Sequence, residues 1–188
     1  MSVTVSYGVL YYAFTVLAPA ISVDTGWSAT AVTAAFSAGS LTGAVAGIAV
    51  GRLLQRRGPR LVMTAGSALG AAAIALVALA PSYPVFVAAW LLVGLASSAT
   101  FYPPAFAALV HWFGSGRVRA ITTLTLVAGF ASTIFAPLTA ALGEGLGWRA
   151  TYLALAALLL IVTMPAHALA LRLPWHAAES VGHRRPDR

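Results

Sequence analysis

The chain has 188 residues, of which 60% are hydrophobic and only 8% are charged, a balance that excludes an ordinary soluble domain and indicates an integral membrane protein. Its net charge of +7 comes from arginines that lie between or after apolar stretches. This placement indicates membrane orientation rather than nucleic-acid binding. Cysteine is absent, which excludes disulfides and thiol-based metal or redox sites.

Six apolar stretches follow one another along the chain, and the connections between them are short. Each stretch is long enough to cross about 30 Å of hydrocarbon at about 1.5 Å per residue. None shows the alternation of apolar and polar residues that marks the strands of a membrane barrel. The sequence therefore predicts an all-α membrane protein with six transmembrane helices, over residues 3–22, 30–51, 61–80, 84–110, 119–142 and 150–172.

The predicted bundle occupies residues 1–173, and a polar tail, residues 174–188, is expected to be disordered. The first apolar stretch has no basic residue before it, as a secretory signal peptide would have. We therefore expect this stretch to remain in the mature protein as a membrane span.

The arginines are distributed unevenly over the two sides of the predicted bundle. If the N-terminus is cytoplasmic, ten of the eleven arginines lie on the cytoplasmic side, and Arg149 lies outside. Because basic residues accumulate on the cytoplasmic side of membrane proteins, both termini are expected to be cytoplasmic. The expected location is the plasma (inner) membrane.

A short sequence echo indicates a repeated unit. Residues 58–60 read Gly-Pro-Arg and open the third predicted span, while residues 147–149 read Gly-Trp-Arg and open the sixth. Three spans per unit place these two turns on opposite faces of the membrane. This is the arrangement of a 3+3 inverted repeat, from which many transporters are built.

Glycine recurs at every fourth position of the second predicted span, which forms a groove along one helix face. Two uses of this groove stay open, namely static packing inside the bundle or a sliding contact with a second half of a transporter. The glycines are Gly39, Gly43, Gly47 and Gly51.

The connection between the second and third spans carries glycines, an apolar residue and arginines at set positions, namely Gly51, Leu53, Arg56, Gly58 and Arg60. This pattern resembles the signature of the major facilitator superfamily, which has glycines, an apolar pair, an acidic residue and basic residues. Gln55 stands where the family has the acidic residue. The resemblance implies a charged cytoplasmic latch, which Gln55 would weaken; an orientation anchor is the alternative interpretation.

Within this superfamily, the second half of the chain is similar to the monocarboxylate and oxalate/formate branch. The similarity rests on residues 112–113, 117–120 and 147–152 with Gly129 and Pro137. It implies a small organic solute, such as a monocarboxylate or another organic anion. Two departures, Trp90 in place of an arginine and residues 136–141 without the Gly-Pro-x-x-Gly-Gly motif, argue against proton-coupled drug export.

Aromatic and hydroxyl side chains are the candidates for a substrate path, because the middle of each predicted span lacks Asp, Glu and Arg. The resemblance implies that the first and fourth helices line the transport cavity. Simple packing or lipid contact is the alternative for each side chain. The candidates are Tyr7, Tyr11, Phe101, Tyr102 and Thr133. His111 and His167 are expected to snorkel or to pack rather than to couple transport to protons.

The function expected from the resemblance is secondary transport by alternating access, not enzyme chemistry. No serine-protease pattern, metal-ligand spacing or phosphate-binding loop is present in the sequence, so neither a metal nor a cofactor is expected. Family members have twelve helices, and this chain supplies six. The expected partners are therefore the lipid bilayer, a small solute and a second six-helix half, from a second copy or another chain. An inactive truncated product and a membrane scaffold are the alternatives.

Overall fold

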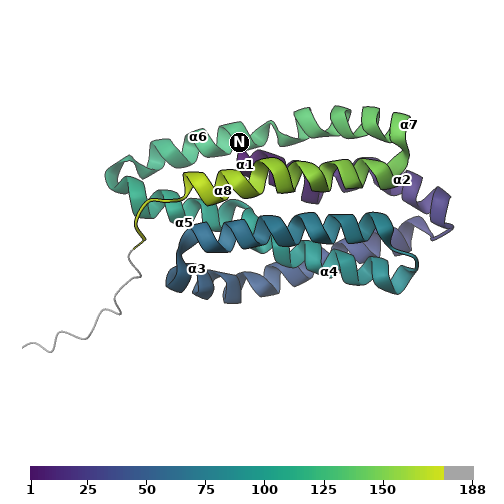
Figure 1. Cartoon of the computed structure of the whole chain (residues 1–188), viewed down its shortest axis with the longest axis horizontal. Coiled ribbons are helices and arrows are strands. Elements are labelled where there is room, and N and C mark those ends of the chain that lie inside the picture. The colour runs from purple at the N-terminus through teal and green to yellow at the C-terminus, as the bar shows by residue number, and fades with distance from the viewer. Residues whose placement is uncertain (176–188) are drawn as a thin grey trace, which may run out of the picture.

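The computed structural model describes residues 1–175, and these residues are almost entirely helical, with no strand among them. The elements are α1 (Ser2–Tyr7), η1 (Gly8–Tyr12), α2 (Ala13–Thr25), α3 (Ala29–Leu79), α4 (Tyr83–Thr100), α5 (Tyr102–Phe113), η2 (Gly114–Gly116), α6 (Arg117–Gly129), α7 (Ala131–Leu158), η3 (Leu159–Thr163) and α8 (Met164–Ala170). Long helical rods lie alongside one another (Figure 1). The predicted all-α class is confirmed.

The first rod runs from α1 through the π-helical turn η1 into α2 and ends at Gly26, whose φ of 71° only glycine adopts readily. The next helix then starts with a capped N-terminus. The Ser28 hydroxyl accepts a hydrogen bond from the Ala31 amide at 3.1 Å.

Helix α3 consists of two arms that meet at Gly58, where φ is 77° and ψ is 166°. The first arm covers residues 29–57 and the second covers residues 59–79. Pro59 fits directly after the reversal because the first residue of a helix needs no amide donor. The prediction that the arginine-rich connection is a loop is therefore wrong. Residues 51–57 are helical, and the chain reverses at a single glycine.

Helix α7 has the same kind of reversal at Gly147, with φ of 76° and ψ of 165°. Its first arm covers residues 131–146, and residues 148–170 form a second arm that continues through η3 into α8. The two turns that echo each other in sequence therefore share one backbone conformation.

Arginines tie the second arms of α3 and α7 together at both ends. Arg60 Nε donates to the Ala168 carbonyl at 2.9 Å, and Arg149 Nη1 donates to the Ala78 carbonyl at 2.7 Å. Both carbonyls belong to the last turn of a helix, where no intrahelical donor is available. Each arginine lies just after one glycine reversal and caps the far end of the other arm.

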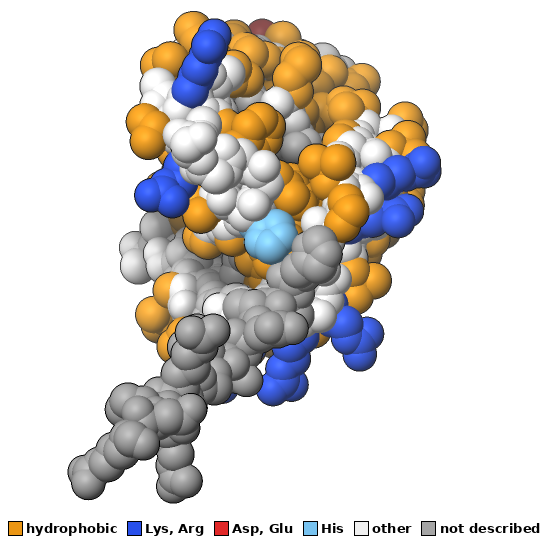
Figure 2. All heavy atoms as spheres, turned by 90° about the vertical axis from the view of Figure 1, so that its left-hand side faces the viewer, with side chains coloured by type: hydrophobic (Ala, Val, Ile, Leu, Met, Phe, Trp, Pro, Cys, Tyr) orange, Lys and Arg blue, Asp and Glu red, His pale blue; other side chains and the backbone are white. Residues whose placement is uncertain are grey.

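The interior is filled by one large hydrophobic cluster that draws on α2, both arms of α3, α4 and α7. Trp90, Tyr152 and Phe86 are its largest fully buried side chains. One end of the bundle, defined here as the arginine-rich end, carries Arg52, Arg56, Arg57, Arg60, Arg117, Arg119 and Arg172. Figure 2 looks onto that end and shows its basic side chains around the rim.

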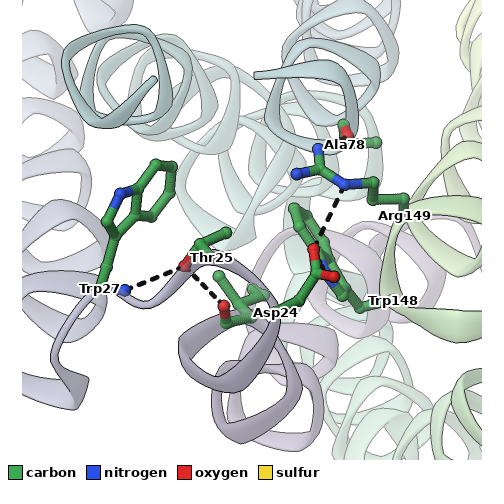
Figure 3. A network of polar contacts seen from close by, with 7 residues as sticks. Asp24, Thr25, Trp27, Ala78, Trp148 and Arg149 are labelled. Carbon is green, nitrogen blue, oxygen red and sulfur yellow. Dashed lines mark hydrogen bonds and ion pairs between the residues drawn. The ribbon is translucent and has the colours of Figure 1, made fainter. Parts of the chain in front are cut away.

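The other end carries a small polar network (Figure 3). Asp24 accepts a hydrogen bond from Trp148 Nε1 at 3.0 Å and lies 3.5 Å from Arg149 Nε. The Arg149 guanidinium also stands over the Trp148 ring, 4.3 Å from its centroid. Both charged side chains are about half exposed, so their ion pair contributes little to stability, and the network mainly fixes how α2 meets α7.

Candidate functional site

A cavity of about 380 Å³ lies between the first rod, the first arm of α3 and α4. Aromatic side chains dominate its walls, and the polar groups at its edge are hydroxyls. The residues that define it are Tyr7, Tyr11, Phe36, Trp90, Ser97 and Phe101.

One wall is a stack of aromatic rings contributed by helices far apart in sequence. The Tyr7 ring stacks on the Phe101 ring with centroids 3.8 Å apart and an interplanar angle of 13°. Tyr102 packs against the same tyrosine at 4.9 Å and in turn on Phe106 at 5.1 Å. Such offset ring pairs add about 0.5–1.5 kcal/mol each beyond their burial, so this wall is held firmly.

The opposite wall is built around Phe36. Its ring stacks on Phe14 at 4.2 Å with an interplanar angle of 3°, and Tyr11 packs on it at 5.4 Å. The edges of these rings meet Trp90, whose centroid is 5.2 Å from that of Phe36. The Trp90 indole nitrogen is buried and has no hydrogen-bond partner among the described residues.

A break between α4 and α5 places Phe101 in the cavity. Phe101 separates α4 from α5 with an extended conformation, φ −81° and ψ −163°. Pro103 and Pro104 cause the break, because a proline inside a helix removes an amide donor and clashes with the preceding turn. The chain restarts at Tyr102 as α5, with its prolines in the first turn, where no amide donor is needed.

The first arm of α3 approaches α4 with the two backbones almost in contact. A Cβ at Gly39 would collide with the Trp90 carbonyl, and one at Gly94 would collide with the Gly39 carbonyl. Gly43 faces the Gly94 carbonyl in the same way. Two glycines of the predicted ladder thus pack inside this bundle.

The other two ladder glycines, Gly47 and Gly51, have nothing within 4 Å of the position that a Cβ would take, and they line a second cavity of about 420 Å³. This cavity shares Gly43, Ala44, Ser98 and Pro103 with the first, so the two form one track along the ladder. Its far end, at the arginine-rich end, is lined by Trp175.

The segment after α8 folds back over the turn of α3. Trp175 Nε1 donates to the Gln55 carbonyl at 3.1 Å, and its ring comes within 3.0 Å of the position that a Cβ on Gly58 would take. Trp112 Nε1 donates to the Pro174 carbonyl at 3.0 Å. The start of the predicted tail is therefore packed on the bundle, while residues 176–188 lie outside the described residues.

The structure brings together part of the predicted substrate path. Tyr7, Tyr11 and Phe101 line the first cavity, and Tyr102 supports it from behind by contact with Tyr7. Thr133 does not line it and is exposed on α7. Phe36 and Trp90 were missed by the sequence analysis, although both are bulky aromatic side chains in the interior of predicted spans.

The predicted latch motif lies at the arginine-rich end, where most of its side chains are exposed. Gln55 and Arg56 are exposed, Leu53 is partly exposed, and Gly51 lines the second cavity. Gly58 is the reversal itself, and Arg60 caps the end of α8. The motif thus shapes the turn between the two arms of α3.

Among the residues that the structure describes, no charged side chain lines either cavity. The hydroxyls of Ser97 and Ser98 donate back to carbonyls of their own helix, at 2.8 and 2.7 Å. The described residues also contain no group of three or more His, Cys, Asp or Glu that could hold a metal ion. The site therefore suits a solute with an apolar or aromatic surface, held by packing and by tyrosine hydrogen bonds.

Residues 1–186 match the Major Facilitator Superfamily in a comparison with protein families. The chain belongs to this superfamily. A comparison with curated proteins gives no match. The major facilitator superfamily consists of secondary transporters rather than enzymes, and the described helices include spans long and apolar enough to cross a membrane. The protein is thus an integral membrane protein of a transporter family, as the signature around Gly58 predicted.

Proposed function

We propose that the chain is a six-helix half of a secondary carrier, with the aromatic cavity between Tyr7 and Phe101 as its part of the solute path. The cavity is the main support for this proposal. It lies where the proline-induced break between α4 and α5 and the π-helical turn η1 interrupt two long helices. Irregular backbone is tolerated inside a membrane where it is buried in protein or lines a cavity.

The six spans would form two inverted units of three, as the sequence echo predicts. Two observations support this arrangement. The reversals at Gly58 and Gly147 have the same dihedral angles, and the arginines two residues after them cap each other's helix ends. Inverted repeats allow a carrier to alternate by rocking between a state open to one side of the membrane and a state open to the other, which is the mechanism we propose.

The proposed solute is a small organic molecule, with a monocarboxylate or related anion as the first class to test. No cationic side chain lines the cavity, so a carboxylate would find its counter-charge on the second half of the carrier. The aromatic walls would hold the organic part of the solute. The distribution of arginines supports a cytoplasmic position for the arginine-rich end and for both termini, in the plasma membrane.

Uptake into proteoliposomes tests the proposal. The screen uses short radiolabelled carboxylates, sugars and cationic drugs, with and without a pH gradient. Phe101→Ala removes the ring that stacks on Tyr7, and we expect it to reduce uptake about tenfold, since one lost stack weakens binding by about 0.5–1.5 kcal/mol and also widens the path.

Phe130→Ala is the matched control, because Phe130 is a 60% exposed aromatic residue between α6 and α7, away from the cavity. Equal uptake by both variants would reject the cavity as the path. Uptake of sugars or cationic drugs alone would reject the carboxylate class. A protein without uptake of any kind, alone or with a second six-helix chain, would favour the scaffold alternative.

A further inference from the structure

His167 is buried inside the bundle, in α8, with 2% of its surface exposed. It does not snorkel, as one of the two sequence-based interpretations had it. The side chains of Asp, Glu and Arg in the described residues are all exposed, so His167 is the charged or imidazole side chain that the bundle buries. Histidine is the side chain that ordinarily changes its charge near neutral pH.

The hydrogen bonds of the ring determine which nitrogen carries the proton. Nδ1 lies 2.8 Å from the Ser67 hydroxyl and 3.2 Å from the Met63 carbonyl. The Ser67 hydroxyl itself donates to that carbonyl, at 2.9 Å. Since a carbonyl can only accept, the tautomer that satisfies all three contacts at once is the one with the hydrogen on Nδ1. Nε2 is then the nitrogen with a free lone pair.

Nε2 is buried and has no hydrogen-bond partner among the described residues. A neutral ring fits this environment, whereas a ring protonated on Nε2 would bury an N–H group without an acceptor. A buried donor without an acceptor is costly, so protonation requires α8 to move relative to the second arm of α3, on which Met63 and Ser67 lie.

The charged groups around the ring are positive. Arg60 on α3 and Arg172 after α8 both donate to the Ala168 carbonyl, next to His167, at 2.9 and 3.5 Å. The amino group of Met1, before α1, also acts on His167 through its charge. Asp24 and Glu144, the acidic residues of the described part, are exposed, and Asp24 pairs with Arg149 at the opposite end of the bundle. No carboxylate of residues 1–175 therefore stabilises a charged ring in this arrangement.

We propose that Nε2 of His167 is a proton-binding site that is empty when α8 packs on the second arm of α3 and is loaded when this seam opens. Proton binding to Nε2 and movement of α8 are then coupled, because Nε2 cannot hold a proton while α8 is packed on the second arm of α3. The use of this site to couple transport to a proton rests on the proposed carrier function. Proton binding itself does not.

The test is nuclear magnetic resonance of the full chain, labelled with ¹⁵N-histidine, in lipid nanodiscs. His111→Gln and His167→Gln assign the ring signals. At pH 8 we expect His167 to carry its proton on Nδ1. On acidification both nitrogens become protonated, and amide exchange in α8 rises about tenfold or more beyond its chemical pH dependence, because an unsatisfied buried donor drives the seam open.

His111→Gln is the matched control and should keep this rise, whereas His167→Gln should lose it. A proton on Nε2 at neutral pH would overturn the proposal. So would a ring that stays neutral until circular dichroism shows the helices unfolding, or one that becomes protonated while α8 exchange is unchanged. Uptake plays no part in the measurement, so a negative result leaves the carrier function untouched.

Discussion

Gly39 and Gly47 belong to the same glycine ladder on the first arm of α3 but have opposite surroundings. A methyl group at Gly39 would meet the backbone carbonyl of Trp90, which cannot rotate away, whereas a methyl group at Gly47 would have nothing within 4 Å. The ladder is therefore a packing surface at one end and a cavity wall at the other. Sequence spacing alone could not separate these two uses.

Substitution of Gly39 by alanine should destabilise the bundle by roughly 1–3 kcal/mol, the usual cost of forcing an extra methyl group into a packed interface. Gly47→Ala is the matched control on the same helix face. It should leave stability unchanged or raise it by up to about 1 kcal/mol, since alanine is the better helix former. Equilibrium unfolding in mixed micelles measures both, and equal midpoints would mean that α4 does not approach the arm this closely.

At the scale of the helices, the positions at which the chain reverses depend on backbone conformation more than on hydrophobicity. Gly147 has φ of 76°, a region that other residues occupy at a cost, while Gly145 two residues earlier lies in regular helix with open space around it. These two neighbouring glycines allow the reversal to be tested separately from helix propensity.

We expect Gly147→Ala to destabilise the protein by roughly 1–3 kcal/mol, because φ of 76° with ψ of 165° lies in a region that is essentially restricted to glycine. Gly145→Ala, in the same helix, should cost nothing and can gain up to about 1 kcal/mol. Thermal unfolding followed by circular dichroism distinguishes them. If the two variants melt together, the reversal at residue 147 is not the conformation that the protein adopts.

At the same scale, the sequence predicted the helices because their apolar stretches are long, but it misplaced where they end. The arginines after Gly51 favoured a loop, yet long arginine side chains extend from a helix that continues beyond the apolar core. The break at Phe101 lies inside a stretch predicted as one span, although its cause, Pro103 and Pro104, was visible. Phe36 was not predicted to line the cavity, because its contact with Trp90 depends on the close approach of α3 to α4.

At the scale of the whole molecule, the first arm of α3 has an exposed face. Thr30, Thr33 and Ser37 are exposed there and line a shallow hollow, which is a polar surface for a helix in contact with lipid. We therefore propose that a second six-helix half docks on this face, either as a second copy of the chain or as another six-helix protein.

A single cysteine introduced by Ser37→Cys should give covalent dimers in liposomes on treatment with a short bifunctional reagent, if two copies pair. The chain has no other cysteine, so the background is clean. Ile161→Cys is the control, because Ile161 is 71% exposed on η3. Dimers at residue 37 alone support pairing through this face. Monomers at both positions reject self-association, and equal dimer yields indicate random collision.

The arginine caps at the two ends of the bundle have a consequence for assembly. Arg149 satisfies the end of α3 and Arg60 satisfies the end of α8, an exchange like that of an isologous dimer, where two copies contribute the same contact to each other. During synthesis, the last turn of α3 receives its arginine donor only after Arg149 has been made. Each second arm therefore receives a donor for its last turn from the other, so the two arms stabilise each other within one polypeptide.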